Sequence, residues 1–173
     1  IREHHDAGQL RELLVRWAYN EPTFERIAPL AQPRLETLAD WAPLTQHFFT
    51  DQVHPDPAEL VAKGKDEQET ARILQLTLWR LEAQRDFSAD ELDGLFREIA
   101  ERLEVKLRDF TRPFYVAITG AKASTPLFQS MEILGPDLVR VRLRHAVEAL
   151  GGLSTKKLKQ LEKDYGALFG ARD

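Results

Sequence analysis

Apolar residues recur at the spacing of an α-helix over most of this chain. The first such run extends from Leu10 to Ala18 and breaks at Asn20–Pro22, where a proline stops helical continuation. A second run, from Leu35 to Phe49, keeps its apolar residues on one stripe. Pro33 suits the first turn of that run, and Pro43 is expected to end or kink it.

Two further helices are predicted from their start signals. Asp66–Glu69 has the spacing of a capping box, in which two side chains satisfy free backbone N–H groups, and it opens an apolar run to Leu81. Ser88–Glu91 repeats this spacing before a run that reaches Leu103. Both patterns predict helices with one buried face.

The segment Phe114–Gly120 has a different composition, because aromatic and β-branched residues dominate it. It is predicted to form a short strand or a buried extended segment. Ser124 is the expected N-cap of the next helix, with Pro126 inside its first turn, and Gly135 is expected to stop that helix.

Pro136 restarts a helix that continues to Leu150 and is expected to end at Gly151–Gly152. Ser154 then opens a last amphipathic helix. The whole pattern predicts a mainly all-α fold, a helical bundle or α-helical cage of two subdomains. At most one short extended segment is expected, near residues 114–119.

The composition agrees with such a fold, since 43% of the residues are hydrophobic, 30% are charged and no stretch is long and apolar enough for a membrane span. Residues 1–105 carry 12 basic and 21 acidic side chains, a net charge of −9, whereas residues 106–173 carry 12 and 7, a net charge of +5. We therefore divide the chain into an N-terminal helical subdomain, 1–105, and a basic C-terminal helical subdomain, 106–173. A local basic surface suits contact with a polyanion, although unequal halves are also common in helical proteins.

The sequence shows no catalytic constellation. It has no cysteine, which excludes thiol nucleophiles, disulfides and iron–sulfur clusters and fits a cytoplasmic protein. It also lacks glycine-rich phosphate loops and paired histidines at zinc-site spacing, and adjacent His4 and His5 cannot both face one ion without distant ligands. We predict no catalytic residue and no metal ligand here. Because the chain begins at Ile1, we interpret it as a piece of a longer protein.

Binding is better supported than catalysis, and the loop Thr119–Pro126 is the strongest candidate. Its glycine, hydroxyls and single lysine precede a helix N-terminus, where free N–H groups suit phosphates or the edges of unstacked bases. Phe114 and Tyr115 offer a stacking face, and arginines 140, 142 and 144 follow on the next helix. The alternative is that the aromatic segment is core and the loop only a connector.

Several motifs occur in a fixed order. Val116–Gly120 reads V-A-I-T-G, Ser124–Phe128 reads S-T-P-L-F, and an L-G stop at Gly135 precedes the arginine-bearing Val139–Leu143. Upstream, Pro33–Ala39 reads P-R-L-E-T-L-A. In this order and spacing the motifs resemble the C-terminal anticodon-binding region of bacterial glutamyl-tRNA synthetases. A class I lysyl-tRNA synthetase is a related family that fits the loop less well.

The resemblance implies the all-helical anticodon-binding part of a class I synthetase that attaches glutamate to tRNA with ATP and Mg²⁺ in the cytoplasm. It implies tRNA-Glu as partner, with tRNA-Gln left open as a second, and neither DNA nor a membrane. The family's two catalytic signatures are absent from these residues, so the chain's own catalytic domain is expected upstream of Ile1. This segment is expected to hold no cofactor.

The tRNA-binding residues that we predict come from the loop, from its neighbours and from the arginine-bearing helices. They are Arg34, Tyr115, Thr119, Lys122, Ser124, Thr125, Pro126, Arg140 and Arg144. Two of them depart from the family pattern, since Tyr115 stands where an arginine is common and Thr125 where a proline is common. These departures keep an alternative function open, a synthetase-derived helical module that binds a protein partner and does not read the anticodon.

Overall fold

The fold is all-helical, as the sequence predicts. A computed structural model describes residues 6–19, 21–122 and 124–170, and within these ranges every regular element is a helix. The elements, with η for short 3₁₀ helices, are α1 (Ala7–Tyr19), α2 (Glu21–Ala31), η1 (Gln32–Arg34), η2 (Leu38–Asp40), α3 (Trp41–Thr45), η3 (Gln46–Phe48), α4 (Pro57–Leu60), α5 (Glu67–Ala83), α6 (Ala89–Arg102), α7 (Leu107–Thr119), α8 (Leu127–Ala149) and α9 (Thr155–Phe169).

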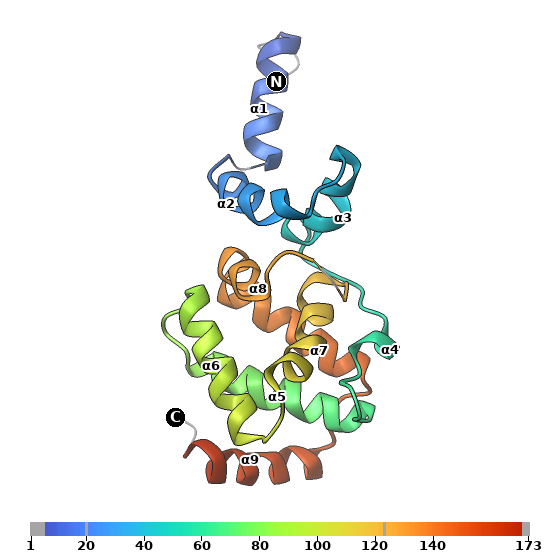
Figure 1. Ribbon diagram of the computed structural model, residues 1–173, viewed down its shortest axis with the longest axis vertical. Helices are drawn as coiled ribbons and strands as arrows, with labels where there is room; N and C mark the ends of the chain where they lie inside the picture. The colour runs from blue at the N-terminus through green and yellow to red at the C-terminus, as the bar shows by residue number, and fades with distance from the viewer. Residues whose placement is uncertain (1–5, 20, 123, 171–173) are drawn as a thin grey trace.

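The helices form an elongated molecule with α1 and α9 at opposite ends (Figure 1). α1, α2 and α3 lie at one end, and α4 to α9 form a bundle at the other. α8 is the central element, since it packs against α5, α6 and α7 in the bundle and against α2 and η3 from the first part. It therefore joins the two parts of the molecule.

One hydrophobic core fills the bundle. The Phe96 ring of α6 lies 4.8 Å from that of Phe114 on α7 and 5.2 Å from that of Phe128 on α8, measured between ring centroids. The core continues from Leu60 to Tyr165 and crosses the proposed division after residue 105. That division therefore stays a prediction based on charge.

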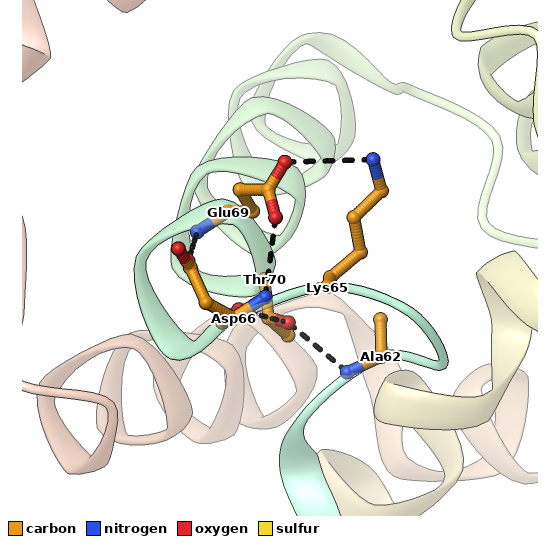
Figure 2. A network of polar contacts seen from close by, with 5 residues as sticks. All are labelled: Ala62, Lys65, Asp66, Glu69 and Thr70. Carbon is orange, nitrogen blue, oxygen red and sulfur yellow. Dashed lines mark hydrogen bonds and ion pairs between the residues drawn. The ribbon is translucent and has the colours of Figure 1, made fainter.

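The predicted capping box at the start of α5 is confirmed (Figure 2). The Asp66 carboxylate accepts from the Glu69 N–H at 2.7 Å, and the Glu69 carboxylate accepts from the Asp66 N–H at 3.1 Å. The buried Thr70 hydroxyl extends this network, because it donates to the Asp66 carbonyl and accepts from the Ala62 N–H at 3.0 Å. Free donors at this helix end thus have partners.

The predicted interruption of α8 is also confirmed. Gly135 has φ 79° and ψ 165°, a backbone conformation reserved for glycine, and Pro136 restarts the helix. α8 then ends at Ala149, before two left-handed glycines, and α9 starts behind Ser154, whose hydroxyl accepts from the Lys157 N–H. α1 ends at Tyr19, as expected, whereas Asn20 lies outside the described residues.

The helix predicted from Leu35 to Phe49 is wrong. This stretch consists of short pieces, η2, α3 and η3, and Leu38 of the expected buried stripe is 91% exposed. The physical reason lies in local caps: the Asp40 carboxylate accepts from the Thr37 N–H and so starts a new turn within the run. A helix that the periodicity missed, α2, precedes it.

The extended segment predicted near 114–119 is wrong as well, because these residues form the second half of α7. Burial overrides the β propensity of the segment: Phe114, Val116 and Ile118 are all fully buried in the core. Gly120, with φ 76°, ends the helix in the left-handed conformation.

Candidate nucleic-acid interface

The loop between α7 and α8 begins with a closed hydrogen-bond ring around Thr119. The buried Thr119 hydroxyl donates to the Tyr115 carbonyl at 2.8 Å and accepts from the Ala121 N–H at 3.3 Å. Lys122 follows in the loop with its ammonium group 2.9 Å from the Glu59 carboxylate of α4. Thr119 therefore shapes the loop, and Lys122 is its exposed cation.

The second half of the loop points inward. The Thr125 side chain is fully buried, 2.7 Å from the Ser130 hydroxyl and 3.4 Å from Nε2 of His47. The Ser124 hydroxyl donates to the Leu44 carbonyl at 3.3 Å. Ser124 is thus not the N-cap of α8, and that prediction is wrong: the loop is anchored to the α3–η3 region instead.

Tyr115 takes over the cap of α8. Its phenol oxygen accepts from the Leu127 N–H at 3.3 Å, directly after Pro126, which occupies the N-cap position. An arginine in this place has no acceptor atom and cannot make this bond. The tyrosine at position 115, where the family commonly has an arginine, is therefore tied to the way in which α8 is capped.

Behind the loop lies Arg142, a buried side chain that links separate segments and that the sequence did not single out as structural. Its guanidinium donates to the Ile118 carbonyl at 2.6 Å, to the His47 carbonyl at 2.7 Å and to the Thr50 carbonyl. Burial lowers the pKa of Arg142 to about 10, while nearby Asp51 acts in the opposite direction. The guanidinium is therefore charged at neutral pH and ties η3 to the end of α7.

His47 shares this buried site and is neutral. Burial, followed by the charge of Arg142, lowers the pKa of His47 to about 3. Because a second positive charge is unfavourable beside Arg142, the imidazole can only contribute neutral hydrogen bonds here.

The other predicted arginines lie apart from the loop's inner network. The Arg140 guanidinium donates to the Leu81 carbonyl at the end of α5, and Arg144 pairs with Glu82 at 2.9 Å. Arg34 is exposed in η1, where it donates to the Leu30 carbonyl. Arg140 and Arg144 thus hold α8 to α5, and the structure does not bring the nine predicted residues together in one place.

A basic hollow of about 620 Å³ lies beside the loop, and sequence reasoning missed most of its residues. Tyr115 and Lys122 connect it to the predicted site. We call it the α7 basic hollow, and its lining residues are Lys63, Lys106, Arg108, Asp109, Thr111, Arg112, Tyr115 and Lys122. The spacing of Arg108, Arg112 and Tyr115 puts them on one helical face, but that signal is visible only once the segment is treated as a helix.

The comparisons with known proteins decide the family. A family model described as an anticodon binding domain matches residues 9–147. The chain belongs to the anticodon-binding domain family. It is also 36% identical to the glutamate–tRNA ligase of Marinobacter nauticus over 168 residues, which are 97% of this chain and 34% of that protein. It is 42% identical to the glutamate–tRNA ligase of Stutzerimonas stutzeri over 148 residues, 86% of this chain and 30% of that protein.

This anticodon-binding domain spans about a third of the length of the curated relatives it matches, and it corresponds to their C-terminal region. The resemblance identified from the motifs is thereby confirmed. Within the described parts of the domain, no three His, Asp or Glu side chains gather to hold a metal ion. In the same parts, no helix has the length and apolarity needed to cross a membrane.

Proposed function

We propose that this domain binds the anticodon arm of tRNA as part of a glutamate–tRNA ligase. The observation that carries the proposal is the anticodon-binding family match over residues 9–147, together with relatives that cover nearly the whole chain. The complete protein, in this proposal, attaches glutamate to tRNA-Glu with ATP and Mg²⁺ in the cytoplasm, and the chemistry resides outside these residues.

Solvent exposure and internal contacts together divide the nine predicted residues into two roles. Tyr115, Lys122 and Pro126 have accessible surface at the loop and are proposed to contact RNA directly. Arg34 is proposed to contact phosphate from the first part of the molecule, where it is exposed.

The remaining residues are proposed to act mainly by holding the loop and its helices. Thr119, Ser124 and Thr125 fix the loop through internal hydrogen bonds. Arg140 and Arg144 fix α8 against α5, and their remaining N–H groups are proposed to face phosphate. Sequence reading then depends on the shape of the loop as well as on its side chains.

The test is the affinity of the protein for transcribed tRNA-Glu and for the same transcript with a changed anticodon, at two salt concentrations. We expect binding that weakens with salt, because phosphate contacts release counterions, and that weakens further when the anticodon is changed. Binding that ignores the anticodon, or no binding at all, would refute the proposal.

A further inference from the structure

The α7 basic hollow contains more unpaired positive charge than any internal role explains. Five of its eight lining residues are basic and one is acidic. Lys122 pairs with Glu59, but within the described residues no carboxylate lies within 4.0 Å of a charged nitrogen of Lys63, Lys106, Arg108 or Arg112. All four are exposed, so their charges face solvent from one concave surface.

On the neighbouring helices α5 and α6, arginines form ion pairs with carboxylates. On α5, Arg72 pairs with Asp164 and Arg80 pairs with Glu98. On α6, Arg97 pairs with Asp93 and Arg102 pairs with Glu98. The arginines of these two helices thus have carboxylate partners that Arg108 and Arg112 lack.

The position of these cations on α7 is unfavourable for the isolated domain. Lys106 is the N-cap residue and Arg108 lies in the first turn, where the helix dipole favours negative charge. Only Asp109 in that turn has the favourable sign. Grouped cations at a helix N-terminus cost stability, and a bound anion removes that cost.

The chemistry of the hollow selects phosphate as the anion. A guanidinium presents paired N–H donors that match the oxygens of a phosphate, and here two guanidinium groups lie one helical turn apart. Tyr115 at the same hollow adds an aromatic face for a base, and the Thr111 hydroxyl adds a neutral hydrogen-bonding group. Several cations beside one aromatic ring suit successive nucleotides better than a single small anion.

We propose that the α7 basic hollow binds backbone phosphates of the RNA strand adjoining the nucleotides at the 119–126 loop, through Arg108 and Arg112 with Lys63 and Lys106. The inference rests on the proposed function, which supplies the RNA. It adds phosphate-binding residues from α7 and the α4–α5 connection to those already proposed on α8. Since phosphates carry no sequence information, the hollow adds affinity equally for every anticodon.

The test compares two double variants of the full-length protein, each of which removes two positive charges. R108Q/R112Q removes the two guanidinium groups of the hollow, and K159Q/K163Q removes two exposed, unpaired lysines of α9. Binding to the tRNA-Glu transcript and to its anticodon-changed version is measured over a series of KCl concentrations. Neither pair is buried, and a single cooperative urea transition in each verifies that both variants fold.

We expect R108Q/R112Q to weaken binding of both transcripts by the same factor, about 10-fold or more, and to reduce the slope of log K against log[KCl] by about 2. K159Q/K163Q is expected to stay within about 2-fold of the parent, because removing charge outside the contact surface changes only long-range attraction. R108K/R112K keeps the charge and should retain the parent slope.

Three results would overturn the inference: parent-like binding by R108Q/R112Q, equal losses in both double variants, or a loss confined to one anticodon. In the first two cases, the proposed function is still tested separately by whether the unmodified protein binds the two transcripts with different affinities. A parent that binds neither transcript removes both proposals.

Discussion

The phenol oxygen of Tyr115 accepts the N–H of Leu127 across a 3.3 Å gap, so a side chain on one helix caps the helix that follows. Because the first N–H groups of a helix lack partners within it, this bond does for α8 what a serine cap would do and links α7 directly to the start of α8. The loop that joins the two helices is held at both ends by this contact.

Replacing Tyr115 with phenylalanine should lower the free energy of unfolding by about 0.5–1.5 kcal/mol, since only the accepting oxygen is lost. Urea denaturation measures the change. Y115R, which installs the arginine common in the synthetase family, also lacks an acceptor and should lose at least as much. A Y115F variant with the parent's urea midpoint would show that the cap contributes nothing.

Among the polar residues of the described chain, Arg142 should be the one whose replacement lowers the free energy of unfolding most. R142M leaves the carbonyls of Ile118 and His47 without their donor in the interior, which is expected to cost about 2–6 kcal/mol at 1–3 kcal/mol for each buried group. R144M, on the same helix, breaks only an exposed ion pair and should cost no more than about 1 kcal/mol. Equal urea midpoints for the two variants would contradict this assignment.

His47 should make the protein less stable in acid. Its pKa is about 3 in the folded protein against 6.5 for an ordinary histidine. Between these pH values His47 therefore binds a proton in the unfolded chain but not in the folded protein. Stability from this group is complete above pH 6.5 and falls as the pH drops toward 3, by up to about 1.4 kcal/mol per pH unit.

The measurement is the urea midpoint at several pH values for the parent, H47Q and H54Q. H47Q should flatten the pH dependence between pH 6.5 and 3, whereas H54Q changes an exposed histidine and should leave it as in the parent. A parallel pH dependence in the parent and H47Q would locate the acid sensitivity elsewhere.

Replacing Gly135 with a residue that has a side chain should lower the stability of the protein. No neighbouring atom lies within 4 Å of a Cβ built there, so G135A meets no collision, but its φ of 79° with ψ 165° is strained for alanine by about 1–3 kcal/mol. G94A, in the regular part of α6, should instead stabilise the protein by about 0.5–1 kcal/mol. Thermal unfolding of both variants separates the two effects, and a gain in both would contradict the strain at Gly135.

Caps and glycines allowed several helix limits to be predicted from the sequence. Asp66, Gly135 and Ser154 act through bonds or backbone angles within a few residues, so their effect is readable locally. The α7 segment was not predictable in this way, because its β propensity is outweighed by the burial of Phe114 against Phe96 of another helix.

The same distinction holds for the candidate site. Tyr115 and Lys122 were identified from motifs, whereas Arg108 and Arg112 were overlooked, since their common face depends on α7, a helix that the sequence analysis did not predict. The burial of Thr125 depends on His47, 78 positions earlier, and no local pattern reveals such a pairing.

The bonds of Arg142 also bear on how the protein is made. Arg142 follows His47 by 95 positions and Thr50 by 92. At about 5–20 residues per second, a ribosome adds Arg142 on the order of 5–20 s after these partners. The α3–η3 region is therefore synthesised early but completes its docking late, and a nascent chain stopped before Arg142 should leave it open to proteases.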